Sequence, residues 1–563
     1  MLGGGRDRWT WGLLALAIFA AIPLVYAWST GAASIPHNDD WAFTRVLFHL
    51  SRTGDLKLVG WNEMILLGHL FWAYPLVRLF GEHIVILDTA VGLISVSGVV
   101  GTAILARRFL PAPFALATGA LLAVFPGYIQ TSVSYMTDPV AFLAQIACFL
   151  VGLAGIERDD DRGPTLIGIS MLIGLFAFSI RKFALITPVA VGIGAAAAGW
   201  RRGRIPTETI VAVALFLLGA GTIYYFRQAI PNGGSHAFGT PGLRQLIVLT
   251  AQSVFTLGLA ASPVLLFVAR RRPDLLGRYL NLGALLGVGL VAVTLHHSSE
   301  ITTCCLGGRS SVFVGNALTE RGMMGNQGAL GDRPTLFPYA YWIALTALGS
   351  VGGVIGLGWL WSGARKWLRD GSDVEPGLLA LISWGILTGV AIVSRAALGG
   401  PLFDRYLTVP LVVAAIVALR AVKDEGASKI PRSAGAVFLL LAFTSLLLMT
   451  SGLSFDVARW RAGEAAVRAG TPATSVDAGF EWVGFHYDGV AEEDIPPISF
   501  RMGPGYFDAF PAAANCIVVA TSPQDNPELA FWRTVPYRTW FGFRELELWV
   551  YRHGSACPNV GET

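Results

Sequence analysis

Apolar residues recur along this chain in long runs that short polar segments separate. A run of about 20 apolar residues forms a helix long enough to cross the roughly 30 Å hydrocarbon layer of a membrane. On this criterion the pattern predicts about 13 membrane-spanning helices. Their approximate ranges are 10–28, 84–106, 111–130, 138–156, 164–180, 183–199, 208–226, 246–269, 279–297, 337–362, 377–397, 405–422 and 433–452.

Two stretches depart from this pattern. Within residues 38–80, apolar residues follow helical spacing, and the turn Arg52-Thr53-Gly54-Asp55 divides them. This spacing predicts two amphipathic helices on the membrane surface. From about residue 453, a polar helix over 455–468 and strand-like runs over 475–487, 516–520 and 545–551 predict a small soluble domain.

We therefore expect a mostly α fold in two parts. Residues 1–452 would form a membrane bundle that includes the surface helices in 38–80, and residues 453–563 a small α+β domain. The first span can also be read as a cleaved signal peptide. A retained helix is favoured, because many spans follow and Ala27-Trp28-Ser29 is a poor cleavage site.

The composition supports a membrane protein and argues against a soluble globular protein and a nucleic-acid-binding protein. The 563 residues are 54% hydrophobic and 14% charged, with a mean hydropathy of +0.58, which is too apolar for a soluble globule. A net charge of +4 is too small to indicate nucleic-acid binding, so the expected partner surface is a lipid bilayer.

Short basic clusters between the spans predict the topology. They include Arg107-Arg108, Arg270-Arg271-Arg272 and the run around Arg365. A cytoplasmic N-terminus puts every such cluster on the cytoplasmic side of the cell membrane and places the C-terminal domain outside.

One long external segment, residues 298–336, is rich in Gly, Ser and Asn and fits either a lid or a plain connector. In an oxidising exterior Cys516 and Cys557 are a plausible disulfide pair, and Cys304 or Cys305 could pair locally, but sequence alone does not settle the connectivity.

Two adjacent acids, Asp39 and Asp40, follow the first span directly. Paired carboxylates are costly to hold beside hydrocarbon, so they indicate either a water-lined active site or a solvated loop. A third external acid, Asp138, precedes Pro139 at the outer start of a span. It can serve chemistry or simply stabilise the helix start.

Cations occur at the same predicted face. Arg181 and Lys182 interrupt an apolar stretch, and Arg395 and Arg405 lie at the outer ends of late spans. The planar guanidinium of arginine suits phosphate oxygens. Contacts with lipid headgroups, or an ion pair with Asp404, are the alternatives.

Together these groups fit transfer of a group from a lipid-linked phosphate to a hydroxyl. A carboxylate would accept the hydroxyl proton, and the cations would stabilise the leaving phosphate. Asp39, Asp40 and Asp138 leave open whether a divalent cation takes part.

The sequence resembles the GT-C superfamily of integral membrane glycosyltransferases, in particular the protein O-mannosyltransferases and the aminoarabinose transferases. The similar features, in chain order, are the acidic pair Asp39-Asp40 with Phe43, the step Asp138-Pro139, Lys182 at an outer turn, and Arg405-Tyr406-Leu407. Two positions depart from the pattern: Ala42 replaces a basic residue, for which Arg45 could substitute, and Phe183 replaces a glycine.

The resemblance implies a polyprenyl-phosphate sugar donor, an envelope acceptor that is a glycolipid, polysaccharide or protein, and inversion at the anomeric carbon. It implies that Asp39 is the base and that Asp40 and Asp138 position the acceptor or a metal. The candidate donor-phosphate residues are Arg45, Arg181, Lys182, Arg395 and Arg405. The candidate substrate-binding residues are His37, Phe43, Trp61, His69, Tyr135 and Tyr406.

Two other functions are compatible with so many spans. A transporter or lipid flippase usually holds ionisable groups near the middle of the bilayer, whereas these charges are predicted at outer ends of spans. A non-enzymatic scaffold whose external domain binds a partner is the third reading.

Overall fold

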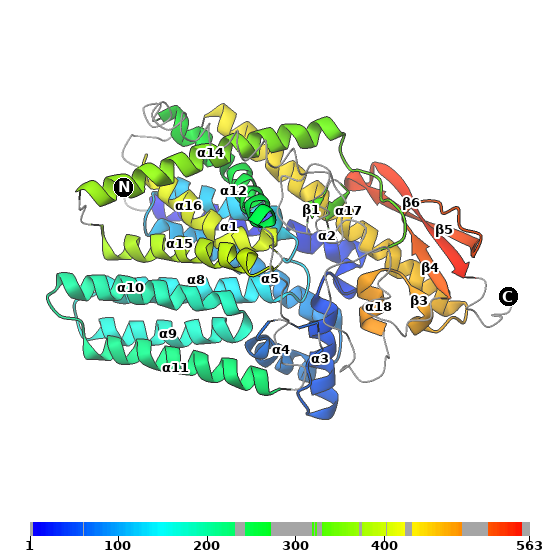
Figure 1. Ribbon diagram of the computed structural model, residues 1–563, viewed down its shortest axis with the longest axis horizontal. Coiled ribbons are helices and arrows are strands. Elements are labelled where there is room, and N and C mark those ends of the chain that lie inside the picture. The colour runs from blue at the N-terminus through cyan, green and yellow to red at the C-terminus, as the bar shows by residue number, and fades with distance from the viewer. Residues whose placement is uncertain are drawn as a thin grey trace.

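The computed structural model confirms a mostly helical fold with a small C-terminal sheet (Figure 1). It describes residues 4–59, 61–62, 64–230, 243–271, 318–319, 321–323, 329–370, 374–400, 402–422, 431–486 and 516–553. The expected span 279–297, residues 298–317, 320 and 324–328 of the segment 298–336, and Cys304, Cys305 and Cys557 lie outside these residues.

The helices and strands follow one another along the whole chain. The α-helices are α1 (Gly4–Ala20), α2 (Ile22–Thr30), α3 (Asp40–Thr53), α4 (Leu67–Phe80), α5 (Ile84–Arg107), α6 (Ala112–Ala123), α7 (Pro126–Ile129), α8 (Thr137–Ile156), α9 (Arg162–Ile180), α10 (Ile186–Arg201), α11 (Thr207–Ala229), α12 (Leu243–Arg271), α14 (Tyr339–Asp370), α15 (Pro376–Ala397), α16 (Thr408–Arg420), α17 (Arg432–Arg468) and α18 (Phe480–His486). The strands are β1 (Leu318–Thr319), β2 (Gly322–Met323), β3 (Val476–Asp477), β4 (Ile517–Ala520), β5 (Leu529–Thr539) and β6 (Arg544–His553). Short 3₁₀ turns include η1 (Ala32–Ser34), η2 (Lys182–Leu185), η3 (Asp404–Leu407) and η6 (Trp540–Gly542).

Ten helices in the described part of the chain are long and apolar enough to cross a membrane. They correspond to ten of the expected spans, so the chain is a multi-pass membrane protein. Expected spans 111–130 and 405–422 form shorter helices, because Pro126 bends the chain from α6 into α7 and the η3 turn precedes α16. A count of 13 stays a prediction.

Helix α8 lies at the centre of the bundle, where it packs against α5, α9 and α10 (Figure 1). Lipid supplies no hydrophobic force between helices, so close packing depends on small side chains. At the crossing of α12 and α14, a Cβ atom on Gly258 would lie 2.1 Å from the backbone nitrogen of Gly353. Only glycine allows these two backbones to approach so closely.

The charged clusters that separate the spans gather at one end of the bundle, here called the basic end. Arg108 pairs with Glu157, and Arg420 Nη2 lies 2.9 Å from Glu375 Oε2. Arg201 Nη2 donates to the carbonyl of Val374 at 2.7 Å. The sheet and α18 lie at the opposite end, here called the domain end (Figure 1).

Two helices, α3 and α4, form in the segment 38–80, and their place at the membrane surface stays a prediction. Helix α3 buries Trp41, Val46 and Leu47, while its last residues, Arg52 and Thr53, are exposed. It contacts both α4 and α18, so it connects the bundle to the C-terminal part of the chain.

Helix α17 continues without a break through residue 452 to Arg468, so the predicted polar helix over 455–468 is its second half. The sheet that follows has the strand order β3-β4-β6-β5, with β3 and β4 parallel and the other pairs antiparallel. β5 is at the edge, which accommodates Pro536, because proline cannot donate a ladder hydrogen bond.

Two of the three predicted strand-like runs are confirmed, by β4 and β6, but the run over 475–487 is wrong after residue 477. There the Asp477 carboxylate accepts the Gly479 N–H at 3.0 Å, and Gly479 has φ +100°. This local turn ends β3 and starts α18. Strand β5 was not predicted.

Candidate active site

The loop between η1 and α3 carries Asp39. Asn38 adopts a left-handed backbone with φ +58°, which turns the chain sharply before the helix begins. The His37 N–H donates to Asp40 Oδ1 at 2.7 Å and closes the turn. The two acids therefore differ in position: Asp39 is the last residue before α3, and Asp40 is the first residue of α3.

Asp39 accepts two hydrogen bonds from side chains far away in the sequence. Trp61 Nε1 donates to Oδ1 at 2.9 Å, and Arg405 Nη2 donates to Oδ2 at 3.3 Å. Burial raises the pKa of Asp39 above its ordinary value of 3.8, and Arg405 and Trp61 offset only part of that rise. A carboxylate with a raised pKa is a stronger base than an ordinary aspartate.

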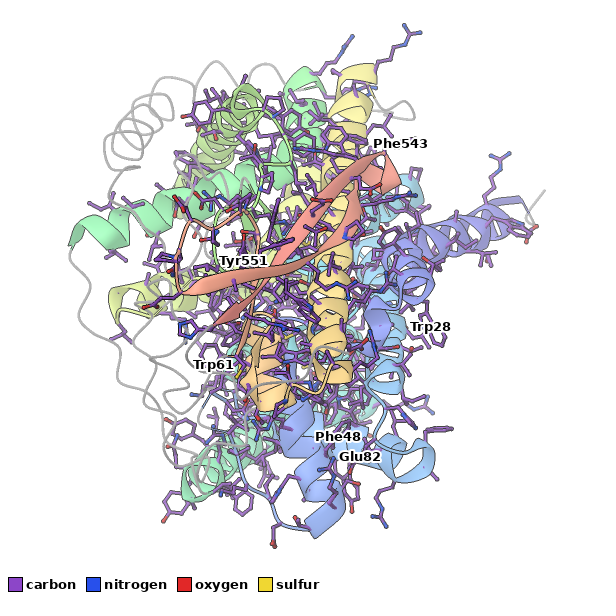
Figure 2. The ribbon with its side chains drawn as sticks, turned by 90° about the vertical axis from the view of Figure 1, so that its right-hand side faces the viewer. Trp28, Phe48, Trp61, Glu82, Phe543 and Tyr551 are labelled. Atoms are coloured by element: carbon purple, nitrogen blue, oxygen red, sulfur yellow. The ribbon has the colours of Figure 1, made fainter. Side chains whose placement is uncertain are left out.

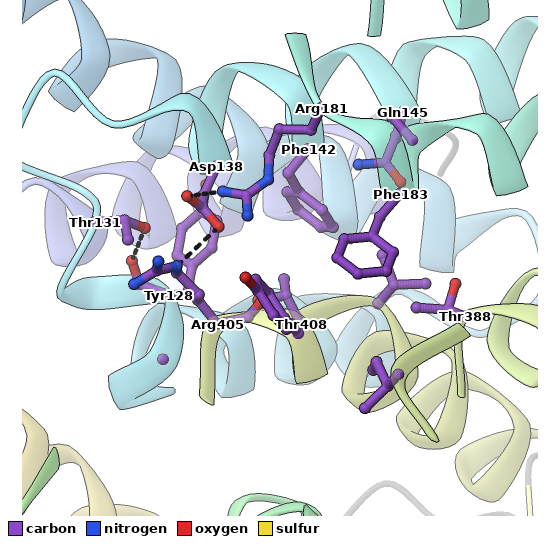
Figure 3. A pocket seen from close by; sticks show the side chains of 15 residues that line it. Tyr128, Thr131, Asp138, Phe142, Gln145, Arg181, Phe183, Thr388, Arg405 and Thr408 are labelled. Atoms are coloured by element: carbon purple, nitrogen blue, oxygen red, sulfur yellow. Dashed lines mark hydrogen bonds and ion pairs between the residues drawn. The ribbon is translucent and has the colours of Figure 1, made fainter. Parts of the chain in front are cut away.

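Arg405 joins Asp39 to the second carboxylate, Asp138. Its Nε lies 3.6 Å from Asp138 Oδ1, while Asp138 Oδ2 pairs with Arg181 Nη1 (Figure 3). The side chains come from the α3 start, the first turn of α8, the end of α9 and η3. Four separate elements thus deliver an alternating row of two carboxylates and two guanidinium groups at the domain end.

Three arginine side chains lie close to the ring of Tyr406. The guanidinium carbons of Arg181, Arg395 and Arg405 lie 5.5, 5.8 and 5.7 Å from its centroid. Phe183 packs against the same ring at 5.2 Å. Cations within about 6 Å of an aromatic centroid are attracted by the ring quadrupole, so Tyr406 holds three positive charges in a small region.

A cavity opens beside this row of charges (Figure 3). Its charged lining consists of Asp138, Arg181 and Arg405. The rest of the lining is mainly apolar or neutral: Gly127, Tyr128, Thr131, Phe142, Gln145, Phe183, Ala184, Thr388, Ile392, Tyr406, Thr408 and Val409. The cavity thus offers a charged part for an anion and apolar walls for a hydrocarbon.

The η3 turn is held in place by contact with α7. A Cβ atom on Gly127 would lie 2.7 Å from the carbonyl carbon of Asp404, so a larger residue would displace the turn that carries Arg405 and Tyr406. Asp404 itself is fully buried, and burial raises the pKa of its carboxyl well above the ordinary value.

Asp40 does not line the cavity, and both of its carboxylate oxygens bind backbone. Its Oδ2 accepts the Tyr135 N–H at 3.2 Å, and its Oδ1 accepts the His37 N–H. Burial raises the pKa of Asp40 well above its ordinary value, which the charge of His37 offsets in part. Asp40 thus fixes the Asp39 loop against the segment that precedes α8.

His37 begins a buried polar network that reaches the C-terminal domain. Its Nδ1 faces Asp456 Oδ2 and its Nε2 faces the Ala32 carbonyl, both at 2.8 Å. Because both partners are acceptors, the ring binds them best with a proton on each nitrogen. Burial alone would lower the pKa of His37, but the hydrogen bond and charge of Asp456 more than offset burial.

The network continues through Arg459 to Glu481 of α18. Arg459 Nη2 donates to Asp456 Oδ1 at 2.6 Å, and its Nη1 donates to Glu481 Oε2 at 3.0 Å. Glu481 Oε1 accepts the backbone N–H of Asn38, the residue before Asp39, at 3.2 Å. Helices α17 and α18 therefore help to define the position of the Asp39 loop.

Three other predicted site residues, His69, Phe43 and Trp61, make ring contacts with neighbouring side chains. His69 stacks on Tyr135 at 4.2 Å and accepts the Trp72 indole N–H, and burial lowers the pKa of His69 to about 3, so it is a neutral packing residue. Phe43 packs against His69 at 6.1 Å. Trp61 packs against Phe480 of α18 at 4.7 Å.

Two predicted cations are placed differently from the three around Tyr406. Arg45 Nη1 donates to the Gly484 carbonyl of α18 at 2.8 Å, so it contacts the C-terminal domain. Lys182 is half-buried in η2, beside Arg181, and does not line the cavity. Asp456, Arg459 and Glu481 were not predicted, because nothing in their local sequence distinguishes them from ordinary charges on polar helices.

The carboxylates fit a divalent cation poorly. In the described residues no group of three His, Cys, Asp or Glu side chains is arranged to hold a metal ion. Asp39 and Asp138 are instead bridged by the guanidinium of Arg405, which occupies the space between them with positive charge.

Replacing Glu481 with Ala is expected to destabilise the protein. The change leaves Arg459 buried with one partner fewer and frees the Asn38 N–H, and removing one member of a buried ion pair costs about 3–5 kcal/mol. The measurement is thermal unfolding of the purified protein. Glu464→Ala is the matched control, because Glu464 lies on α17 with a side chain 50% exposed. Equal unfolding temperatures for the two variants would contradict the role of the network.

No family model and no curated protein matches the sequence. A search of solved structures finds ArnT from Cupriavidus metallidurans bound to undecaprenyl phosphate, with 14% identity, coverage of 97% of this chain and 98% of that chain, and a TM-score of 0.43. ArnT is an aminoarabinose transferase, one of the groups that the sequence motifs resemble.

The search also finds the oligosaccharyltransferase AglB from Archaeoglobus fulgidus in complex with an inhibitory peptide and a dolichol-phosphate. That chain is 15% identical, with coverage of 88% of this chain and 62% of AglB and a TM-score of 0.44. A complex of the Archaeoglobus fulgidus oligosaccharyltransferase with Zn and sulfate gives 15% identity, coverage of 80% and 55%, and a TM-score of 0.43. This chain thus spans less than two thirds of both oligosaccharyltransferase chains.

Proposed function

We propose that this protein is a membrane glycosyltransferase that transfers a sugar from a polyprenyl-phosphate donor to a hydroxyl of an envelope acceptor. The observation that carries the proposal is the contact between Asp39 and Arg405 beside a cavity with a charged part and apolar walls. It joins a base to a cation cluster, which are the two groups that this reaction needs at adjacent positions.

Asp39 is the general base of the proposed reaction. Its carboxylate accepts the proton of the acceptor hydroxyl, and the acceptor oxygen forms a bond to the anomeric carbon of the sugar. The bond from that carbon to the phosphate oxygen breaks, and the electron pair leaves with the lipid phosphate. Attack from the side opposite the phosphate inverts the anomeric carbon.

Arg181, Arg395 and Arg405 stabilise the charge that develops on the leaving phosphate. Their guanidinium groups are fixed by Tyr406, so little reorganisation is needed when the charge appears. Asp138 keeps Arg181 and Arg405 apart and oriented. The apolar residues of the cavity, such as Phe142, Ile392 and Val409, suit the first isoprene units of the donor.

The proposed topology puts this chemistry outside the cell membrane. A cytoplasmic N-terminus places the basic end in the cytoplasm, as the excess of arginine there favours. The domain end, with Asp39 and the C-terminal domain, then faces the envelope. A hydroxyl acceptor reaches Asp39 from that side, while the donor enters from the leaflet.

Asp39→Asn is expected to abolish transfer, because the amide cannot accept the hydroxyl proton while its shape is retained. The assay follows labelled sugar from a polyprenyl-phosphate donor to envelope fractions with purified enzyme. Asp55→Asn, an exposed residue in the turn after α3, is the control and should remain fully active. Full transfer by Asp39→Asn would rule out this base.

Arg405→Lys is expected to raise the KM for the donor by roughly 10- to 100-fold, since a lysine ammonium cannot reproduce the fork that spans Asp39 and Asp138. Initial rates at varied donor concentration give this value. The control is Arg52→Lys, whose side chain is 66% exposed and pairs with Glu82 on the surface. An unchanged KM would place the donor phosphate elsewhere.

The pH profile tests the base independently. Asp39 must be ionised to act, so kcat/KM falls as the pH falls through its pKa, which lies above the ordinary 3.8. The Trp61 N–H stabilises the ionised form, so Trp61→Phe raises this pKa and moves the acidic limb to higher pH. Trp28→Phe, at an exposed position, should leave the limb in place. A limb that does not move in Trp61→Phe would show that another group titrates.

A further inference from the structure

The hairpin that joins β5 to β6 ends in Trp540-Phe541-Gly542-Phe543. Trp540, Phe541 and Phe543 are here called the aromatic turn. Phe543 is 93% exposed and Phe541 is 43% exposed, although both are large and apolar. Soluble domains seldom place such residues at the tip of a hairpin, because the apolar area gains nothing from contact with water.

The backbone of the turn is built to present these rings outward. Trp540 and Phe541 both have a left-handed conformation, with φ +52° and +55°, which bulky residues rarely adopt. Two contacts hold it: Trp540 Nε1 donates to the Leu336 carbonyl, and the Phe543 N–H donates to the Trp540 carbonyl, both at 3.1 Å. Strained backbone that is fixed in this way often marks a functional position.

The aromatic turn lies against a membrane-spanning helix. The rings of Trp540 and Phe541 have centroids 6.3 and 6.0 Å from that of Phe443 in α17. Phe443 falls within the apolar segment 433–452 of that span and is itself 43% exposed. Leu439, one turn earlier, is 67% exposed. The apolar surface therefore runs without interruption from α17 onto the turn, and Figure 2 shows Phe543 at the hairpin end beside α17.

Basic residues flank the aromatic turn on both strands. Arg538 and Arg544 are exposed and stand on either side of it, with Arg544 opposite Thr539 in the β5–β6 register. Arg544 Nη1 donates to the Thr335 carbonyl at 3.1 Å, and this contact holds the start of β6 beside the segment that precedes α14. Aromatic rings next to arginines are typical of segments at the boundary between hydrocarbon and phosphate headgroups.

We propose that the aromatic turn inserts into the membrane leaflet at the domain end, so that the C-terminal domain has a lipid contact of its own. The occupant of this surface is lipid, because the surface continues the exposed apolar side of α17 and the exposed Arg544 beside it suits a lipid phosphate. Arg538 lies 3.6 Å from Glu545 and is paired with it. The contact also fixes the distance of α18 from the bilayer, and α18 carries Glu481 against the Asp39 loop.

The test measures depth in the full-length protein reconstituted in phosphatidylcholine nanodiscs. A bimane label is placed at Phe543→Cys or, as the control, at Phe531→Cys, in a background whose five native cysteines are replaced by serine. Phe531 is 56% exposed on β5, and the nine residues from it to Trp540 extend over roughly 30 Å. Phase-specific quenchers are a nitroxide-labelled phosphatidylcholine and aqueous iodide.

We expect the lipid nitroxide to quench the label at position 543 several-fold more than the label at 531, and iodide to show the reverse order. Equal iodide quenching at both positions would overturn the proposal. Energy transfer between labels at 543 on two copies, without lipid quenching, would also overturn it in favour of a contact between copies.

A second variant keeps the test independent of the label site. With the label at Glu545→Cys, the double substitution Phe541→Ser and Phe543→Ser should reduce lipid quenching at least two-fold, because the anchor is removed. Phe531→Ser should leave the quenching unchanged. A cooperative thermal unfolding transition confirms that each variant is folded. Unaltered lipid quenching in the double variant would contradict insertion.

Discussion

The guanidinium of Arg405 is the point on which the site depends. Its side chain is only 2% exposed, and a buried cation would be costly without partners of opposite charge. Asp39 and Asp138 supply those partners, and Arg405 in turn keeps two carboxylates close together that would otherwise repel each other. The base and the phosphate-binding cations therefore share one ion-pair system, so neither can be moved without disturbing the other.

The same balance of burial and charge recurs at the loop that carries Asp39. His37, Asp456, Arg459 and Glu481 are all buried, and each is stable there because its neighbours carry the opposite charge. This second system lies on the far side of the loop from the cavity. Asp39 is thus held from one side by Arg405 and Trp61 and from the other by its backbone, which leaves it little freedom of position.

Much of the site could be predicted from the sequence because topology gathers charges at one end of the bundle. Asp39, Asp138, Arg181 and Arg405 each follow or precede a span, and the alternation of spans puts them on one face. Their contacts could not be predicted, since Arg405 and Asp39 are 366 positions apart. Asp40 could not be separated from Asp39 by pattern alone. Only the position of the α3 start separates them: the carboxylate of Asp39 contacts Arg405, whereas that of Asp40 accepts backbone N–H groups.

Helix α17 fixes the rotation of the residues beyond its apolar segment relative to the membrane-spanning part of the same helix. It runs for 37 residues from Arg432 to Arg468, and Asp456 and Arg459 project from the part beyond the apolar segment. A single inserted residue below Asp456 would rotate everything beyond it by about 100° and shift it by about 1.5 Å. The Asp456 carboxylate would then point away from His37. The number of residues in α17 is therefore set by the direction in which Asp456 must point as well as by the thickness of the bilayer. An insertion or deletion would preserve that direction only if it added or removed whole helical turns.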